Sequence, residues 1–471
     1  MKNKLVSHWT VALALLLMIF FASLPVLLKN QNNPSAENPT DSANPDKTLV
    51  MWGLFDEKEV YQGMLEQYES TTGIKVKYYK ISNTLAEYEK LLLNEIAEGK
   101  GPDIFVIKNT WVPKHQGKIS PLSAELGIST ESYAREFVPV ASQDLVLDGQ
   151  IYGIPLYVDS LALYYNDELF RKGVPSQTKP STTWDALKEN ALKITTPDNS
   201  IERFAVAGIS LGRLDNIARG FDILLLQMLQ RGVQLHDQSG TNAIFADQKL
   251  ADGSNPAQSV WQFFASFADP NYQNYCWNES ITLNNSAQEV DAFARGKVAM
   301  IFGYSYLYED IRNQIREVNK NGGTGINLAN VKIAPAPQAT EDTQIALANY
   351  FPYTVSRNSK NATEAWKFLL YLSGEDNLRE YNRQTNRPTP IRSLVAEQSL
   401  DKTYGVFAEQ GAYAGSYNIL DENYYMQVFM EEFAKINSGR STIADALTEA
   451  QTTLNNFLKE NRILKNTTNA E

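Results

Sequence analysis

The stretch LDGQIYGIPLYVDSLALYYNDELFRKGV, residues 147–174, decides the fold. It contains, in this order, a turn, an extended segment, a buried strand and the start of a helix. Asp148-Gly149 predicts a tight turn, and Gly153-Ile154-Pro155 predicts an extended segment that lacks one backbone donor. The apolar run Leu161–Tyr165 is typical of a central strand, and Asn166 is a residue type that caps helices. This order predicts a hinge, where the chain crosses from one lobe into another.

Strands and helices alternate in the residues before this hinge. Apolar runs at 49–52, 74–79 and 103–107 predict strands, and apolar residues at helical spacing over 60–68 and 85–96 predict the helices between them. A βαβαβ order implies an α/β fold with a parallel sheet, which binds ligands at the carboxyl ends of its strands.

Two later blocks have an equally definite order. In EVDAFARGKVAM, residues 289–300, a helix ends at Arg295-Gly296-Lys297, and a strand over 298–302 then leads to Tyr304 and Tyr306. The second block, residues 349–392, holds a loop, a strand at 353–355, a helix and the proline-rich end Arg387-Pro388-Thr389-Pro390.

Together, the three blocks resemble the extracellular solute-binding proteins of family 1, which includes the maltose- and other sugar-binding proteins of ABC transporters. The resemblance implies a two-lobed periplasmic-binding-protein-like fold of type II, with crossings near Pro155, Ile333 and Arg387 and the ligand in the cleft between lobes. The implied domains are residues 48–156 with 333–386 for lobe 1, 157–332 with 387–463 for lobe 2, and a disordered tail over 464–471.

Candidate cleft residues follow from the strand ends, because a side chain just past the carboxyl end of a strand points into the crevice. In the family, the helix, turn and strand of 289–302 deliver an aromatic residue, most often Trp, to the cleft; tyrosine stands here instead. Rings cover the apolar face of a sugar, and carboxylates and amides bind its hydroxyls. The predicted ligand-binding residues are Phe55, Asn109, Thr110, Trp111, Tyr157, Asp159, Trp277, Tyr304, Tyr306, Asn349, Tyr350 and Tyr424.

The N-terminal residues predict where the protein lies relative to the cell membrane. Lysines within residues 1–8 precede an apolar run at 9–28, which has about the 20 residues that a membrane-spanning helix needs. We expect a single-pass anchor that keeps the globular part extracellular or periplasmic, with cleavage after Ala22 as the alternative. Residues 29–47 are polar and proline-containing, which predicts a disordered linker. The only cysteine is Cys276, so the chain departs from the lipidated cysteine common among bacterial binding proteins.

Composition narrows the functional classes. The formal charge is -11 and basic residues form no run, which argues against nucleic acid as a partner. The three histidines are isolated, and no HExxH or paired-cysteine motif is present, so we expect no metal, cofactor or catalytic residue. The expected partners are a small solute, ABC permease subunits and the membrane, and the expected state is a monomer.

Carbohydrate capture for an ABC importer is the function that the resemblance implies. Two alternatives keep the fold but change the solute, to ferric iron held by tyrosines such as Tyr164-Tyr165 or Tyr424-Tyr425, or to a polyol phosphate. An extracellular glycan-active enzyme is a third, for which Asp103 and Asp159 could be proposed as the carboxylate pair. The alternative roles of these two residues are a cap at the strand-loop step for Asp103 and a hydroxyl contact for Asp159. A sensor ectodomain fits less well, because few residues precede the apolar run to carry a signal.

Overall fold

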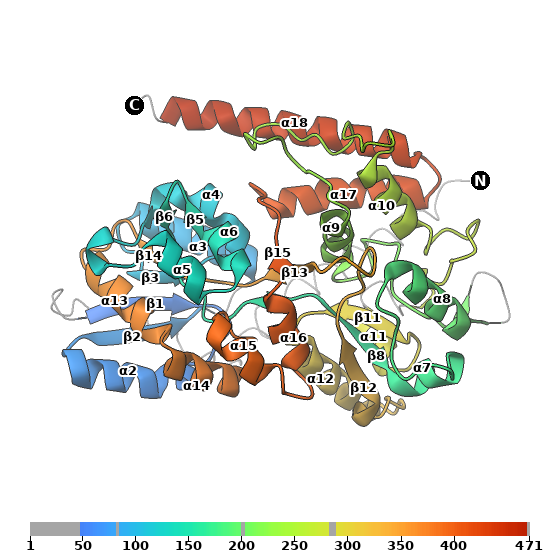
Figure 1. Ribbon diagram of the computed structural model, residues 1–471, viewed down its shortest axis with the longest axis horizontal. Coiled ribbons are helices and arrows are strands. Elements are labelled where there is room, and N and C mark those ends of the chain that lie inside the picture. The colour runs from blue at the N-terminus through green and yellow to red at the C-terminus, as the bar shows by residue number, and fades with distance from the viewer. Residues whose placement is uncertain (1–47, 82–83, 199–202, 282–288, 469–471) are drawn as a thin grey trace, which may run out of the picture. The chain divides into compact units, whose positions relative to one another are not determined.

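The computed structural model describes residues 48–81, 84–198, 203–281 and 289–468 (Figure 1). The predicted n-region, anchor and linker, residues 1–47, lie outside these ranges, so these assignments stay predictions. In the part of the chain that is described, no helix is both long enough and apolar enough to cross a membrane.

The first sheet has five strands in the order β2-β1-β3-β14-β4. Strands β1 (Thr48–Gly53) and β3 (Ile104–Val106) are parallel, as the βαβαβ pattern predicts. Strand β14 (Tyr353–Ser356) joins them from much later in the chain and runs antiparallel to β3. The carboxyl ends of β1 and β3 therefore meet at one edge, where Phe55 and residues 108–111 follow.

The hinge stretch folds as its residues predict. Asp148 and Gly149 have φ values of 52° and 71° and connect the hairpin β5 (Val146–Leu147) and β6 (Gln150–Ile151). Strand β8 (Ala162–Asn166) is fully buried and central in the sheet β11-β8-β12, with both neighbours antiparallel. The side chain of Asn166 accepts bonds from the backbone of the first turn of α7 (Asp167–Gly173), which is the predicted cap.

Two buried apolar clusters form the interior. The first core contains residues 49–158, most of the buried residues between 346 and 394, and Ala414. The second core contains residues 161–336, Leu347 and residues 407–458. Strand β13 (Ala346–Asn349) lies between them, because Ala346 and Ala348 belong to the first core and Leu347 to the second.

The crossing strands form a small sheet of their own. Strand β13 pairs with β7 (Asp159–Ser160) and with β15 (Ala414–Gly415), so the first crossing and the return crossing are bonded to each other. Ile333 lies in β12 (Val331–Ala334), which pairs with β8 of the second core, and the chain reaches the first core only at β13. Residues 388–391 in turn bond to the backbone of Val138 and Val158 in the first core. The exact lobe bounds of the sequence analysis stay predictions.

The C-terminal helices pack side by side on the second core (Figure 1). Helix α17 (Glu422–Asn437) is followed by α18 (Ile443–Thr468). Helix α18 continues through residues 464–468, where the sequence analysis places the start of a disordered tail, because each added residue of a helix gains a backbone hydrogen bond without a new nucleus.

The remaining elements surround the sheets. The helices near the first core are α2 (Lys58–Thr72), α3 (Leu85–Ala97), α4 (Val112–His115), α5 (Thr130–Glu136), α6 (Pro139–Leu145), α13 (Ala362–Leu372), α14 (Glu375–Thr385) and α15 (Arg392–Gln398). Those near the second are α8 (Trp184–Ile194), α9 (Gly220–Gln230), α10 (Pro256–Ala265), α11 (Glu289–Ala294), α12 (Leu307–Lys320) and α16 (Gly405–Gly411). The other strands are β2 (Lys75–Lys80), β4 (Ile119–Ser120), β9 (Thr196–Pro197), β10 (Phe204–Val206) and β11 (Met300–Gly303).

Candidate functional site

A small pocket lies where the two cores meet. Its volume is about 20 Å³, and we call it the interlobe pocket. Lys108 and Thr110 line it from the end of β3, Asp222 from α9, and Asn349 from the end of β13. The remaining lining residues are Leu225, Tyr304, Leu347, Ala348, Ser416, Tyr417, Ile419 and Glu422.

Side chains from both cores bond across this pocket. Lys108 Nζ lies 2.5 Å from Glu422 Oε1, and Thr110 Oγ1 donates to Glu422 Oε2 at 3.1 Å. Lys114 Nζ lies 3.0 Å from Asp421, whose carboxylate also caps the first turn of α17. The segment 416–422 is thus held to the first core by ion pairs at its end.

A buried carboxylate holds the other end of the segment 416–422. Asp144 on α6 accepts hydrogen bonds from the Ser416 hydroxyl, from Asn109 at 2.8 Å and from Tyr350 at 2.9 Å. Gln143 also donates to the Ser416 carbonyl at 2.8 Å. Burial raises the pKa of Asp144 to about 6, although its three hydrogen bonds oppose that shift.

Some polar atoms at the interlobe pocket have no partner. Among the residues that the structure describes, Tyr304 Oη, Asn349 Oδ1 and Asn109 Oδ1 are buried without a hydrogen bond, apart from an interaction between the Tyr304 and Asn349 side chains themselves. Tyr304 and Asn349 both line the pocket. Buried polar atoms are almost always bonded in folded proteins, so unpaired ones that face a cavity indicate a place for a polar ligand or water.

Exposed rings from each core lie near this region. Tyr304 and Tyr306 stack with centroids 6.2 Å apart, and Arg219 lies over both rings at 5.5 and 5.8 Å. Phe55 contacts Phe351 edge to face at 4.8 Å. Phe55 and Tyr306 are 46% and 47% exposed, so both rings can be reached by a ligand.

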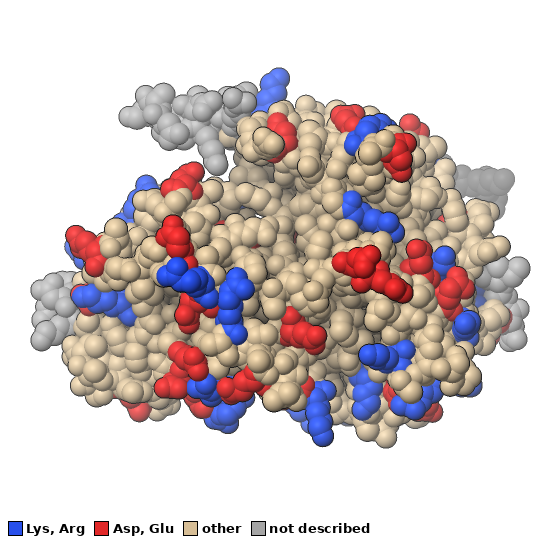
Figure 2. Space-filling model, viewed as in Figure 1, with Lys and Arg blue, Asp and Glu red and all other residues tan. Residues whose placement is uncertain are grey.

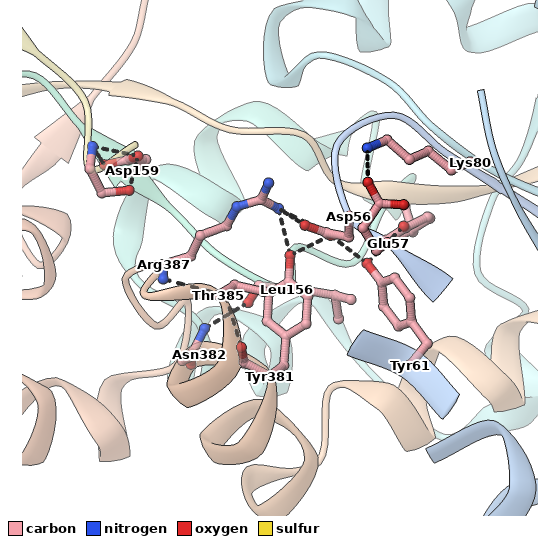
Figure 3. Close-up of polar contacts among 12 residues, drawn as sticks. Asp56, Glu57, Tyr61, Lys80, Leu156, Asp159, Tyr381, Asn382, Thr385 and Arg387 are labelled. Atoms are coloured by element: carbon pink, nitrogen blue, oxygen red, sulfur yellow. Dashed lines mark hydrogen bonds and ion pairs between the residues drawn. The ribbon is translucent and has the colours of Figure 1, made fainter. Parts of the chain in front are cut away.

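Arg387 joins the third crossing to the end of β1, as Figure 3 shows. Its guanidinium lies 2.9 Å from Asp56 Oδ1 and donates to Tyr381 Oη at 2.7 Å. The same guanidinium lies 4.4 Å from the centroid of the Tyr157 ring. Asp56 also accepts hydrogen bonds from the hydroxyl groups of Tyr61, at 2.7 Å, and Tyr381. Its carboxylate therefore makes one ion pair and two hydrogen bonds to phenols. This cluster fixes the crossing segments against the first sheet.

Asp159 ties the first crossing to the turn after β11. Its carboxylate accepts from the backbone N–H of Ser305 at 3.0 Å and from the Ser305 hydroxyl at 2.6 Å (Figure 3). It also accepts from the backbone N–H of Ser160 at 2.9 Å. Burial raises the pKa of Asp159 to about 6, and these bonds oppose the shift. In this arrangement Asp159 positions the strand-end turn that carries Tyr304 and Tyr306.

The predicted ligand residues therefore separate into three groups. Thr110, Tyr304 and Asn349 line the interlobe pocket, and Phe55 and Tyr306 expose their rings. The second group is buried and already bonded: Asn109 and Tyr350 to Asp144, Asp159 to Ser305, Tyr157 against Arg387, and Trp111 edge to face with His115. The third group consists of two aromatic residues that do not line the pocket.

The third group of predicted ligand residues is Trp277 and Tyr424. Trp277 is 0% exposed in the second core and donates to Asn216 at 2.9 Å. Tyr424 stacks on Phe457 of α18 with centroids 4.2 Å apart. Both rings pack against their own core, in line with an aromatic residue's ordinary role.

The sequence analysis missed several residues at the pocket. Asp222 and Arg219 stand at the start of α9, 3.3 Å apart, and Glu422 starts α17. Burial raises the pKa of Asp222 despite the Arg219 charge beside it. An acidic residue at a helix start is ordinary capping chemistry, so nothing in the sequence marks Glu422 or Asp222 as facing another core. Lys108 directly follows the predicted strand 103–107, but its partner Glu422 lies 314 residues away.

Two α/β halves bonded through a crossing sheet, with a polar pocket at the strand ends where they meet, define a binding protein of the two-lobed type. The chain belongs to the family described as bacterial extracellular solute-binding protein, whose model matches residues 53–378. This match confirms the resemblance drawn from the sequence.

Individual relatives agree with that assignment. A binding protein of Brucella abortus is 26% identical over 291 residues, which cover 60% of this chain and 61% of the relative. The chain thus matches only about three fifths of that relative's length. The maltodextrin-binding protein of Bacillus subtilis is 24% identical over 442 residues, covering 91% of this chain and 93% of the relative.

Solved structures show the same fold. The sugar-binding protein MalE from Xanthomonas citri superposes with a TM-score of 0.72 at 19% identity, covering 89% of this chain and 99% of that one. The GacH receptor of Streptomyces glaucescens gives a TM-score of 0.65 at 20% identity, covering 88% of this chain and 98% of that one. The predicted type II α/β fold is therefore confirmed.

Proposed function

We propose that this protein captures an uncharged carbohydrate where its two cores meet and delivers it to an ABC importer. The observation that carries the proposal is the interlobe pocket, where the buried Tyr304 Oη and Asn349 Oδ1 have no hydrogen-bond partner other than each other's side chain. A hydroxyl and an amide that line the same pocket suit the hydroxyls of a polyol, which both donate and accept. The maltodextrin-binding relative supports the same class of solute.

The charges around the pocket support an uncharged solute over a phosphorylated one. Lys108 pairs with Glu422, Arg219 with Asp222, and Arg387 with Asp56. A phosphate recognised in such a site requires basic groups that are available to it. Here each of these cations is already neutralised by a carboxylate, so a phosphate would have to break an ion pair to bind.

The tyrosines proposed for ferric iron are engaged elsewhere. Tyr164 donates to the carbonyl of Tyr304 at 2.8 Å, and Tyr425 is hydrogen-bonded to His236 at 2.5 Å. Tyr424 stacks on Phe457. These contacts favour a packing role for both tyrosine pairs. They therefore argue against these tyrosines as ligands of ferric iron.

The carboxylates proposed for a glycosidase are also engaged. Asp103 accepts from the backbone of Val50 at 2.9 Å and from Ser359 at 2.5 Å, and Asp159 holds Ser305. Glycoside hydrolysis needs two carboxyl groups that flank one bond of the substrate. We therefore propose binding without turnover.

A membrane anchor over residues 9–28 completes the proposal, with the globular part outside the cell membrane. The apolar run and the preceding lysines support it. Membrane fractionation of cells that express the full-length chain tests it: retention in the membrane fraction after a carbonate wash is expected, and release into the soluble fraction at a smaller mass would indicate cleavage.

Ligand capture is tested by thermal shift of the full-length protein against saccharides, polyols, polyol phosphates and ferric iron. A ligand that binds only the folded state raises the melting temperature in proportion to the logarithm of its excess over Kd. We expect shifts with one class of saccharide. A shift with phosphates or iron alone would reject the proposed solute, and glycan turnover in the same samples would reject binding without catalysis.

A further inference from the structure

A separate cavity lies beside the second core, against helix α9. Its volume is about 190 Å³, and we call it the α9 pocket. Its walls come from the first turn of α8, the end of α9 and the middle of α10, with the connection between β12 and β13 at one edge. The lining residues are Trp184, Asp185, Gln227, Arg231, Ser259, Val260, Phe263 and Ala339.

Helix α9 separates the α9 pocket from the interlobe pocket. Asp222 and Leu225 of this helix line the interlobe pocket, whereas Gln227 lines the α9 pocket. Successive residues of an α-helix are about 100° apart around its axis, so Gln227 lies on the far side of the helix from the other two. The described residues that line one pocket do not line the other. The α9 pocket is therefore a cavity of its own and not part of the site proposed for saccharides.

The side chain of Gln227 is the unusual feature of the α9 pocket. The residue is only 3% exposed, and its amide nitrogen and amide oxygen are both buried without a hydrogen bond to any described residue. Burying an unpaired amide costs free energy, so such groups in folded proteins nearly always have partners. Gln230, one turn away, shows the contrast: its amide accepts from Trp184 Nε1 at 2.7 Å and donates to the carbonyl of Pro337 at 2.9 Å. Gln227 thus lacks a partner that can both donate and accept.

Two charged side chains stand at the mouth of the α9 pocket. Charged residues of both signs are interspersed over the face of the molecule that Figure 2 shows, and ion pairs such as Arg379 with Glu375 are the ordinary result of such mixing. Within the described parts of the chain, however, the side chains of Arg231 and Asp185 have neither an ion pair nor a hydrogen bond. Both residues are exposed. A cation and an anion at one mouth favour a ligand that carries both charges, which is a zwitterion.

Apolar side chains complete the walls of the α9 pocket. Val260 is buried, and Trp184 and Phe263 meet edge to face with ring centroids 6.5 Å apart. The volume of about 190 Å³ equals that of roughly six water molecules at about 30 Å³ each. It is below the range of about 300–1,000 Å³ that is usual for larger ligands. The cavity therefore suits a small solute with a short hydrocarbon stem.

We propose that the α9 pocket binds a free amino acid whose side chain carries an amide, with L-glutamine as the best fit. The amide of the ligand supplies the donor and the acceptor that the Gln227 amide lacks. The hydrocarbon stem of the ligand lies against Val260 and Phe263. At the mouth, Arg231 binds the carboxylate and Asp185 binds the ammonium group. This site goes beyond the proposed capture of saccharides, because another face of α9 forms it.

Calorimetry of the full-length protein with millimolar L-glutamine tests the amino-acid site. L-Glutamine is expected to bind. L-Leucine leaves the Gln227 amide unpaired and L-glutamate brings a charge to it, so each is expected to bind at least about tenfold more weakly. L-Glutaminamide lacks the carboxylate and N-acetyl-L-glutamine lacks the ammonium group, so each of these probes is expected to lose a similar factor.

Variants assign the binding to the α9 pocket. Gln227→Leu keeps the approximate size of the side chain and removes its amide, so it is expected to weaken L-glutamine by at least about tenfold without lowering the melting temperature. Arg231→Gln changes an exposed side chain and is expected to bind L-glutamine and L-glutaminamide equally, because the group that distinguishes them is gone. The matched controls are Glu189→Gln on α8 and Arg316→Gln on α12. Both positions are exposed and lie outside the pocket lining, so L-glutamine binding should not change.

The opposite outcomes are equally definite. Unchanged affinity for L-glutamine in Gln227→Leu, or retained discrimination against L-glutaminamide in Arg231→Gln, would overturn the α9 pocket as the site. Equal affinity for L-leucine and L-glutamine would overturn the pairing of amides. Absence of binding by all three amino acids would overturn the proposal and leave trapped water as the partner of Gln227. Tighter binding of N-acetyl-L-glutaminamide than of L-glutamine would replace the free amino acid by a residue within a peptide chain. Saccharide capture is tested separately, by the thermal shift with saccharides.

Discussion

Lys108 Nζ lies 2.5 Å from Glu422 Oε1, and this ion pair joins the end of β3 in the first core to the first turn of α17 in the second. The two side chains are only 12% and 15% exposed, so water screens them little. Because both line the interlobe pocket, a ligand that enters the pocket has to share or displace this pair.

The coupling between Lys108 and Glu422 is measurable by a double-mutant cycle. Lys108→Met, Glu422→Gln and the double variant are expected to give an interaction energy of about 1–3 kcal/mol in urea unfolding. The exposed pair Lys100 and Glu98, 2.9 Å apart, serves as the control and is expected to show no measurable coupling. Additive effects at Lys108 and Glu422 would contradict a contribution of this ion pair to stability.

Two aromatic residues predicted for the ligand site should differ in what their replacement by alanine changes. One variant is expected to lose ligand affinity, and the other is expected to lose stability. Tyr306 is 47% exposed, so Tyr306→Ala is expected to weaken ligand binding by about 1–3 kcal/mol with little effect on unfolding. Trp111 is 3% exposed, so Trp111→Ala is expected to lower the free energy of unfolding by about 3–5 kcal/mol through loss of packing. Tyr306→Phe keeps the ring and should retain most of the affinity. A stable Trp111→Ala variant with weakened binding would restore Trp111 to the ligand site.

Asp56 should be critical for stability because it neutralises a buried cation. Asp56→Ala leaves the Arg387 guanidinium, 17% exposed, without its carboxylate, and is expected to cost about 3–5 kcal/mol in denaturant unfolding. Asp376 pairs with Arg379 at 2.9 Å but is fully exposed, so Asp376→Ala should have no measurable effect. Similar small losses for both variants would show that the Arg387 cluster does not hold the crossing segments.

The carboxyl group of Asp159 should make stability depend on pH. Its pKa in the folded state, about 6, is above the unfolded value of 3.8, so the folded state binds the proton more tightly. Its favourable contribution is full below about pH 4 and is lost as pH rises to about 6, by up to about 3 kcal/mol. The difference in unfolding free energy between the wild type and Asp159→Asn should shrink over this window and stay constant above it. A difference independent of pH would contradict the raised pKa.

The single cysteine should be inert in the folded protein. Cys276 is 0% exposed, and burial raises the pKa of its thiol to about 12. Only the exposed thiolate reacts quickly with disulfide reagents. Reaction with such a reagent at pH 8 is therefore expected to follow the rate of unfolding and to accelerate in urea, whereas rapid reaction of the native protein would show that Cys276 is accessible.

Local patterns predicted most of the elements correctly. The Asp148-Gly149 turn, the buried strand that begins near Leu161 and the Asn166 cap follow from backbone preferences and periodicity within a few residues. The carboxyl-end rule also placed Thr110, Tyr304 and Asn349 at one pocket.

Other site residues could not be predicted, because their roles come from partners far away in the sequence. Asp144 and Ser416 are 272 residues apart, and Lys108 and Glu422 are 314 apart. The sequence around each of these residues resembles that of an ordinary surface position, so it does not mark the residue as part of a contact between the two cores. Trp111 and Trp277 illustrate the converse, since an aromatic side chain looks the same in a sequence whether it faces a ligand or its own core.

The sequence by itself determined the order of strands, helices and crossings in this protein, and through them its family, because turns, caps and apolar periodicity depend on neighbouring residues alone. The tertiary structure decided which polar groups neutralise one another across the two cores, which have no further partner at the pocket, and where a second cavity lies on the far side of α9. Those properties depend on distances between segments that only folding brings together.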